Sequence, residues 1–252
     1  MKHIHLEETN STNSYLRELI RKDPKLDAYT YVTTYEQTSG RGQSGNSWEA
    51  EPGKNISLSL LLRPEKYQDG YTPFDLNIVS SLSLYDFLAK RLPSKESIYV
   101  KWPNDILIDG RKIAGILTEN EWMGDQWEYA IVGIGLNVFQ TQFGAYRPEA
   151  TSLTLEADIK EPKTYEDWHH SMTKEIVENF QSRFRMLSES PVQVRREYLS
   201  YLYRYQEKNA PFRIPNGRSF EGTIIGVEPN GLLVIKEGDE THHFAFKEVQ
   251  FR

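Results

Sequence analysis

Cysteine is absent from this chain of 252 residues, and so is any long hydrophobic segment. Without cysteine, disulfide bonds, cysteine-ligated metal sites and thiol nucleophiles are excluded. The longest apolar patch, Ile56–Leu62, is interrupted by serines and is too short to cross a bilayer. The first residues also lack the apolar core of a secretion signal. We therefore expect a cytoplasmic protein that makes no contact with a membrane.

Positive charge is also scarce, because 30 lysines and arginines stand against 36 aspartates and glutamates and leave a net charge of −6. A protein that mainly grips nucleic acid needs clustered lysines and arginines, so we expect no nucleic-acid partner. The six histidines show no metal-ligand spacing. His169 and His170 are adjacent on a predicted helix, and His242 and His243 alternate across a predicted strand. The histidines therefore predict no metal site.

Hydrophobic periodicity predicts an α/β (α+β) fold in which helices flank a sheet. Thr72-Pro73 is a strong helix start, and a single buried stripe follows it from Phe74 to Leu92. Tight turns between successive strands favour a mixed, largely antiparallel sheet. The predicted helices are 11–22, 73–92, 165–187 and 190–205, and the predicted strands are 29–35, 55–62, 98–101, 106–108, 112–119 and 127–138.

From Gln206 onward the pattern changes to short β runs punctuated by turn dipeptides. The turns are predicted at Asn216-Gly217, Asn230-Gly231 and Gly238-Asp239. About 45 residues of this kind predict a small antiparallel barrel. We therefore expect two domains, covering residues 1–205 and 206–252.

The most informative segment is Lys101-Trp102-Pro103-Asn104-Asp105, which is followed by Lys112 on the next predicted strand. The segment brings together a cation, an amide and a carboxylate, and Lys112 adds a second cation. This arrangement suits a nucleoside triphosphate with its metal ion. Asp105 suits Mg²⁺, and a desolvated Lys112 would offset charge that develops on an acyl-phosphate transition state. The alternative is an ordinary turn with a surface ion pair of little energetic value, since Pro-Asn-Asp is also common turn chemistry.

The segment Gly40–Gly45 matches the pattern G-x-G-x-x-G of dinucleotide-binding folds. A strand is predicted before it, but no helix follows, so no helix N-terminus is available for a pyrophosphate. We reject the dinucleotide-binding interpretation. The glycines still let backbone N–H groups approach an anion, and Arg41 adds a permanent charge. The segment therefore suits a loop that folds over a phosphate-bearing ligand, and a mobile hairpin loop is the alternative.

Three further polar positions are candidates for ligand contact. Gly133–Asn137 ends a strand with two glycines and an amide, which indicates either close packing of a ligand or a bulge. Ser11–Asn13 is most simply a helix cap, although a helix N-terminus also offers free donors to a carboxylate. Gln37 lies just before the glycine loop and has amide groups for a polar ligand.

Taken in order, four motifs closely resemble the biotin–protein ligases, and the resemblance runs from about His5 to Val138. The Lys-Trp-Pro-Asn-Asp run is highly specific, whereas the glycine motifs alone would not be. The resemblance implies an α/β catalytic domain related to class II aminoacyl-tRNA synthetases, with a C-terminal SH3-like β-barrel. The four motifs are Ser11–Asn13, Gly40–Gly42 with Trp48, Lys101–Asp105 with Lys112 and Gly115, and Gly133–Asn137.

The resemblance also implies an activity and its site residues. Biotin and ATP would form biotinyl-5′-AMP and pyrophosphate, and Mg²⁺ would accompany the nucleotide. A lysine on the carrier domain of a biotin-dependent carboxylase would then attack the mixed anhydride. Catalysis would rest on Lys112, Arg41 and Asp105. Biotin would contact Ser11, Thr12, Asn13, Gln37, Gly40, Arg41, Gly42, Gln43, Lys112 and Gly115, and ATP would contact Arg41, Trp48, Lys101, Asn104, Asp105 and Asn137.

This sequence departs from the family pattern in two respects. Some members carry further arginines in the glycine loop, where this chain has Gln43 and Asn46, so the loop is expected to hold the adenylate less tightly. Some members also carry an N-terminal winged helix and repress transcription. Here the motifs begin almost at residue 1, so we expect no such domain and no role in DNA binding.

Rival functions stay open at this point. A lipoate–protein ligase would use the same scaffold, whereas an octanoyltransferase with a cysteine nucleophile is excluded. A biotin-binding regulator without turnover and an adaptor built around the C-terminal β segment are rivals outside enzymology, and retention of both Lys101 and Lys112 argues against the regulator. Paired sheet edges make a homodimer a reasonable expectation.

Overall fold

Two β-sheets and five α-helices organise the part of the chain that the computed structural model describes, which is residues 1–63, 70–95, 97–146, 148–162, 164–215 and 217–252. The larger sheet has seven strands in the order β1-β2-β3-β7-β6-β5-β4. β1 and β2 are parallel, and every other neighbouring pair in this sheet is antiparallel. The mixed, largely antiparallel sheet expected from the turns is therefore confirmed. Its strands are β1 (His3–Thr9), β2 (Tyr31–Gln37), β3 (Asn55–Leu62), β4 (Ile98–Lys101), β5 (Asp105–Ile108), β6 (Arg111–Met123) and β7 (Gln126–Asn137).

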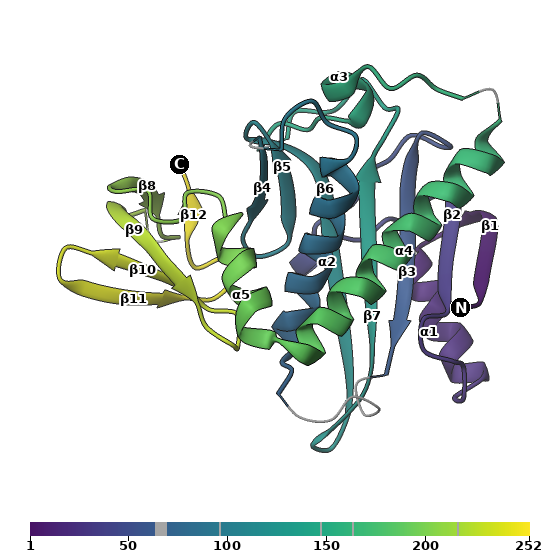
Figure 1. The fold of residues 1–252 in the computed structure, drawn as a ribbon, viewed down its shortest axis with the longest axis horizontal. Coiled ribbons are helices and arrows are strands. Elements are labelled where there is room, and N and C mark those ends of the chain that lie inside the picture. Colours follow the sequence, from purple (N-terminus) through teal and green to yellow (C-terminus); the bar gives the residue numbers. More distant parts are fainter. Residues whose placement is uncertain (64–69, 96, 147, 163, 216) are drawn as a thin grey trace.

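Helices cover both faces of the large sheet. α2 and α4 lie in front of the sheet in Figure 1, with α5 beside them, whereas α1 packs on β2, β3 and β7. Side chains alternate between the two faces, so Leu60 and Leu62 join the α2 side while Leu61 joins the α1 side. The helices are α1 (Thr12–Lys22), α2 (Pro73–Ala89), α3 (Leu153–Ala157), α4 (Tyr165–Glu189) and α5 (Pro191–Ser200).

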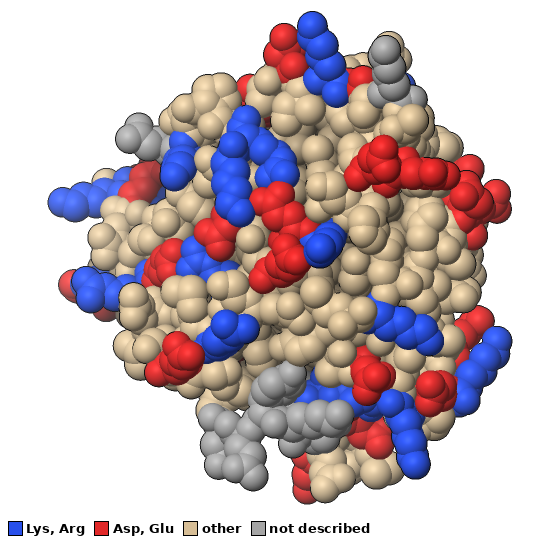
Figure 2. Space-filling model, turned by 45° about the vertical axis from the view of Figure 1, so that its right-hand side comes forward, with Lys and Arg blue, Asp and Glu red and all other residues tan. Residues whose placement is uncertain are grey.

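The surface mixes charges of both signs. On the face shown in Figure 2, lysine and arginine side chains lie among aspartate and glutamate side chains rather than in an extended basic patch. None of the helices in the described part of the chain is long and apolar enough to span a bilayer.

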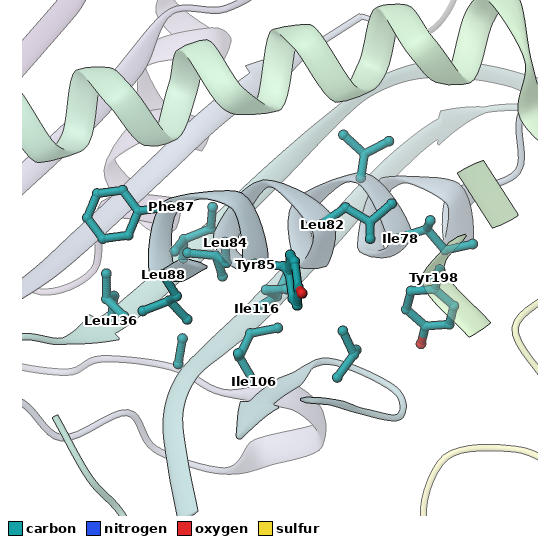
Figure 3. Close-up of a cluster of buried hydrophobic side chains, with 14 of the residues drawn as sticks. Ile78, Leu82, Leu84, Tyr85, Phe87, Leu88, Ile106, Ile116, Leu136 and Tyr198 are labelled. Atoms are coloured by element: carbon teal, nitrogen blue, oxygen red, sulfur yellow. The ribbon is translucent and has the colours of Figure 1, made fainter. Parts of the chain in front are cut away.

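Helix α2 differs from its prediction of a single buried stripe. It lies between the sheet and α4, and most of its residues are buried, including Ser80 and Ser83. Both serines satisfy their hydroxyls by donating to the carbonyl four residues earlier. Figure 3 shows its apolar side chains beside Ile106, Ile116 and Leu136 from the sheet. The helix is hydrophobic on nearly all sides because it has partners on nearly all sides.

The C-terminal segment forms a second sheet of five strands in the order β11-β10-β9-β8-β12. The prediction of a closed barrel is wrong, because β11 and β12 are the two edges of an open antiparallel sheet. β12 contributes only Gln250–Phe251, which is too short to close it. Asn216 of the predicted Asn216-Gly217 turn lies outside the described residues. The other strands are β8 (Ala210–Arg213), β9 (Ser219–Val227), β10 (Leu233–Glu237) and β11 (Glu240–Phe244).

Several element boundaries differ from the sequence prediction. β1 was not predicted, because its alternation of histidines and glutamates with two aliphatic residues gives a weak hydrophobic signal. α5 ends at Ser200 rather than near Tyr205, because the next residues pair with β4, where Tyr203 donates its backbone N–H to the carbonyl of Val100. The short helix α3 was also not predicted.

Candidate active site

Register across four adjacent strands builds the floor of the site. Asp105 of β5 pairs with Gly115 of β6, which pairs with Gly135 of β7, which pairs with Ser57 of β3. Because side chains alternate across a strand, this row faces one side of the sheet, the side that also carries α1. Three segments that are separate in the sequence therefore meet in space. They are Lys101–Asp105, the strand β6 with Lys112, and the strand β7 with Gly133 and Gly135.

A cavity of about 650 Å³ opens over this floor. Its walls come from α1, the ends of β2 and β4, the glycine loop and the turn before β5. Of the site residues predicted from sequence, Gly40 is the exception that does not line it. Those that do are Ser11, Thr12, Asn13, Gln37, Arg41, Gly42, Gln43, Trp48, Lys101, Asn104, Asp105, Lys112, Gly115 and Asn137.

Two lysines face one carboxylate on the cavity wall. The Nζ atom of Lys112 lies 2.6 Å from Oδ1 of Asp105, and Nζ of Lys101 lies 3.8 Å from Oδ2. Burial lowers the pKa of Lys101, and the nearby Lys112 charge adds to this effect while Asp105 opposes it. Lys101 also lies over the ring of Phe251 at 5.5 Å. A single carboxylate between two ammonium groups leaves a positive local charge, which suits a polyanionic ligand.

The glycine loop closes over the floor without forming a dinucleotide-binding turn, as predicted. It contains a short 3-10 helix, Gln43–Gly45, and continues to β3 without an α-helix. The indole of Trp48 lies against Gly115 and Gly135, and Nζ of Lys112 lies 5.7 Å from the Trp48 ring. A Cβ atom at Gly135 would overlap that indole. We call residues 40–48 the flap, and its tryptophan fits the sheet because two glycines make room for it.

Gly40 serves the flap rather than the cavity. Its carbonyl accepts a hydrogen bond from the N–H of Trp48 at 2.9 Å, and a Cβ atom at this position would overlap the carbonyl oxygen of Trp48. Gly42 donates its N–H to the carbonyl of Asn46 at 2.7 Å. These close backbone approaches hold the two arms of the flap together.

A buried polar network joins the start of α1 to the floor. The predicted cap residue Ser11 occupies the N-cap position, but its side chain makes no capping bond. Oε1 of Gln37 instead accepts from the N–H of Thr12 at 2.9 Å and from its hydroxyl at 3.1 Å. The Ser59 hydroxyl oxygen lies 2.5 Å from Oδ1 of Asn13 and 2.7 Å from the Thr12 hydroxyl, and its one hydrogen can be donated to either. Gln37 therefore fixes the helix start from the next strand.

The side-chain amides of Asn104 and Asn137, which were predicted to contact the nucleotide, form hydrogen bonds within the protein. Asn104 donates its side-chain N–H to the carbonyl of Ile116 at 2.6 Å, which ties the turn before β5 to β6. Asn137 donates to the carbonyl of Thr151 at 2.9 Å, while its side-chain oxygen is buried without a partner. The oxygen of Asn137 is therefore an acceptor in the cavity wall that still has capacity for a donor.

Aromatic residues from two distant segments also line the cavity, and sequence reasoning missed them. Phe143 and Tyr146 come from the loop after β7, and Tyr146 contacts Glu49 beside the flap. Phe246 comes from the turn between β11 and β12. Close to it, the indole N–H of Trp102 donates to the carbonyl of Gly231 at 2.9 Å. The pairing of Trp102 with a turn glycine was not visible in the sequence.

The polar groups that line the cavity are mainly cations and amides. In the described ranges there is no cluster of three or more histidine, aspartate or glutamate side chains arranged to hold a metal ion. The cavity offers two lysines, an arginine on a loop, amides and backbone N–H groups. Such groups are suited to stabilising phosphates and carboxylates by charge and hydrogen bonding.

Comparison with known proteins agrees with this geometry. The model of the biotin/lipoate A/B protein ligase family matches residues 6–137. The chain is 36% identical over 147 residues to a biotin–[acetyl-CoA-carboxylase] ligase of Paracoccus denitrificans, covering 58% of this chain and 59% of the relative. It is 30% identical over 215 residues to the bifunctional ligase/repressor BirA of Bacillus subtilis, covering 83% and 62%. The chain thus spans about three fifths of these curated relatives.

The fold comparison covers the whole chain. The structure of biotin protein ligase from Aquifex aeolicus in complex with biotin and ATP superposes with a TM-score of 0.76 at 21% identity, covering 100% of this chain and 98% of that one. At this identity the likeness shows the fold. The family model covers more than half of the chain, and the resemblance inferred from the four motifs is confirmed at the level of the family. The chain belongs to the biotin/lipoate A/B protein ligase family.

Proposed function

We propose that this protein is an ATP-dependent ligase that attaches biotin to a lysine of a carrier domain in a biotin-dependent carboxylase. In the first step, a carboxylate oxygen of biotin attacks the α-phosphorus of ATP and displaces pyrophosphate, which yields biotinyl-5′-AMP. In the second step, the neutral amine of the carrier lysine attacks the acyl carbon. AMP leaves, the amine loses a proton, and an amide bond remains.

One observation carries the proposal: Lys112 and the flap share a single cavity. The Lys112 ammonium group lies 5.7 Å from the Trp48 ring, and Arg41 lines the same cavity from the flap. A reaction that joins a carboxylate to a nucleotide needs a fixed cation at the new bond and a cover that keeps water off the anhydride. The sheet provides the first of these and the flap provides the second.

The residues divide the work by their positions. Lys112 would contact the biotin carboxylate and the reacting phosphate, where it offsets the charge of the transition state. Asp105 holds that ammonium group at 2.6 Å and so orients it. Lys101, Asn104 and Asn137 would contact the nucleotide. Ser11–Asn13, Gln37, Gly42, Gln43 and Gly115 would contact biotin, and Arg41 and Trp48 would close over the adenylate.

The residues present are compatible with Mg²⁺ that arrives with the nucleotide. Mg²⁺ is usually held by one or two carboxylates together with substrate phosphates, and Asp105 is a carboxylate on the cavity wall. The metal would neutralise phosphate charge and leave the positioning of biotin to the protein. We further propose that the chain divides near residue 205 into a catalytic domain and a β domain that supplies Phe246 to the cavity.

Pyrophosphate release and acceptor mass test the proposal together. The protein is incubated with ATP, Mg²⁺ and either biotin or lipoate, with and without a biotin carboxyl carrier domain. We expect pyrophosphate release with biotin, and a mass increase of the carrier domain that corresponds to one biotinyl group. A carrier domain whose acceptor lysine is replaced by arginine is the matched control and should stay unmodified.

Other outcomes of this experiment identify the rivals. Turnover with lipoate in place of biotin would assign the lipoate–protein ligase function instead. Biotin binding without pyrophosphate release would overturn the proposal in favour of a regulator without turnover.

A further inference from the structure

Glu119 lies on β6 just beyond the cavity lining and connects three residues around it. Its Oε2 atom accepts a hydrogen bond from the side-chain N–H of Asn13 at 2.7 Å and lies 2.9 Å from a guanidinium nitrogen of Arg41. Its Oε1 atom lies 3.0 Å from a guanidinium nitrogen of Arg17. One carboxylate thus joins the start of α1, a second position on α1 and the flap.

Backbone register explains why this carboxylate reaches both sides of the cavity. Glu119 is four residues beyond Gly115 on the same strand, so its side chain points to the same face of the sheet as the cavity floor. Its partner across the ladder is Ile131, which packs beside α1. The carboxylate therefore stands between α1 and the flap, where a shorter or uncharged side chain would lose at least one contact.

The charge state of Glu119 supports this arrangement. Burial alone would raise its pKa, but hydrogen bonds from Asn13 and Arg17 and the charges of Arg17 and Arg41 outweigh burial and lower it. The group is therefore ionised at neutral pH and can satisfy three donors. The Glu119 side chain is 19% exposed, so these interactions are less screened than those of a surface pair.

We propose that Glu119 is a positioning residue that couples flap closure to the polar start of α1. By sharing one oxygen between Asn13 and Arg41, it fixes the guanidinium of the flap relative to the Asn13 amide on α1. Arg41 is then held in place before the anionic ligand arrives, and the ligand does not have to order it. The identity of that ligand rests on the proposed function, whereas the coupling between the flap and α1 does not depend on it.

The structure also shows why Arg41 depends on such a contact. Within the flap, Arg41 forms a backbone bridge with Ser47. That bridge holds the loop to itself, while the ion pair with Glu119 ties the Arg41 side chain to the sheet. An ion pair of this exposure contributes little to the stability of folding, since the Arg41 side chain is 39% exposed. Its expected effect is therefore on the position of Arg41 and not on whether the protein folds.

Trypsin cleavage of the ligand-free protein tests the coupling without any assumption about activity. The bond after Arg41 is a trypsin site within the flap. In Glu119→Gln we expect cleavage at this bond to be about threefold faster than in the unmodified protein, as the loss of an ion pair to a partly exposed side chain predicts. Glu121→Gln removes the same charge two residues along the same strand and is the matched control. Equal cleavage rates in Glu119→Gln and the unmodified protein would overturn the proposal.

Kinetics give the second readout. With biotin and ATP, Glu119→Gln is expected to raise the KM for biotin about 10-fold. In an Arg41→Ala background, the same change should add less than about threefold, because residues that act through one another are not additive. Fully additive effects, or an equal rise in Glu121→Gln, would contradict the inference.

Misfolding of the variant and failure of the proposed function can each be told apart from failure of the inference about Glu119. If Glu119→Gln does not fold, Glu119→Asp takes its place, because it retains the charge but shortens the side chain. Its cleavage rate and its KM should both be higher than those of the unmodified protein and lower than those expected for Glu119→Gln. An unmodified protein without biotin-dependent pyrophosphate release would refute the proposed function, and the trypsin result would still decide the role of Glu119.

Discussion

The floor and the cover of the cavity are built in contrasting ways. The floor is a continuous ladder of backbone hydrogen bonds across β5, β6, β7 and β3, and it fixes Asp105 and Lys112. The cover consists of the flap and the loop after β7. The flap, by contrast, is tied to the sheet by a few side-chain contacts such as Arg41 with Glu119. The loop after β7 is intermediate, because Tyr146 contacts Glu49 through its side chain while Glu149 and Thr151 share two backbone hydrogen bonds with Lys112. The difference indicates that the positions of Asp105 and Lys112 are set by folding of the sheet, whereas the position of the flap depends on a small number of replaceable contacts.

Removing the cation of the floor should have the largest effect. We expect Lys112→Ala to slow pyrophosphate release by about 100-fold or more, because a preorganised charge at the reacting phosphate is lost. Lys174→Ala, which removes an exposed lysine on α4, is the control. Initial rates of biotin-dependent pyrophosphate release measure the effect, and a nearly normal rate in Lys112→Ala would contradict the assignment.

Acid should lower the free energy of unfolding through His169, which is buried on α4. Burial, with smaller contributions from His5, His3 and His170, lowers the pKa of His169 on α4 from 6.5 to about 3. As pH falls below 6.5, the unfolded chain therefore binds a proton that the folded chain does not, and stability decreases toward pH 3. The expected slope from this group is about 1.4 kcal/mol per pH unit.

Denaturant titrations between pH 7 and pH 4 measure that slope. His169→Gln removes the titrating group and should flatten the dependence, although other groups keep a remainder, among them His3, whose pKa burial lowers to about 4. His243→Gln changes an exposed histidine of the C-terminal sheet and is the control. An identical slope in His169→Gln and the unmodified protein would exclude this explanation.

A larger residue at Gly135 should displace Trp48 of the flap while the strands of the floor stay paired. In Gly135→Ala the new Cβ atom overlaps the Trp48 indole, so the tryptophan has to leave the sheet. We expect the KM for biotin to rise about 10-fold, in line with the loss of one or two contacts to the ligand. Gly226→Ala on β9 is the control, because its Cβ atom would meet no atom within 4 Å. An unchanged KM in Gly135→Ala would show that Trp48 does not take part in closure.

The smallest effect is expected where the floor meets the C-terminal sheet. Trp102→Phe removes the N–H that donates to the carbonyl of Gly231 but keeps most of the aromatic packing. We expect the free energy of unfolding to fall by about 1 kcal/mol, measured by urea titration. Trp122→Phe is the matched change at a side chain that is 49% exposed. A larger loss in Trp122→Phe than in Trp102→Phe would contradict this account of the junction.

The floor could be predicted from sequence because its parts are local patterns. Strands, tight turns and paired glycines place Asp105, Gly115 and Gly135 on neighbouring strands once an antiparallel sheet is assumed. The rejection of the dinucleotide-binding turn also followed from local order, since no helix follows Gly45. The structure brings these residues together, while their roles in binding stay predictions.

The cover could not be predicted in the same way. Phe143, Tyr146 and Phe246 reach the cavity from segments whose sequence carries no regular period, and their approach depends on tertiary packing. Glu119 was missed because a glutamate near the polar end of a strand resembles an ordinary solvent-facing residue. The barrel was mispredicted because turn dipeptides indicate hairpins but do not specify whether the edge strands are long enough to close.

The reach of Phe246 into the cavity has a consequence for synthesis of the protein. Translation proceeds from the N-terminus, so the seven-stranded sheet and its lysines leave the ribosome well before residue 246. A nascent chain would therefore hold the cationic floor with one wall still missing. The complete cavity can form only after the last strands have emerged, which delays any binding that depends on that wall until then.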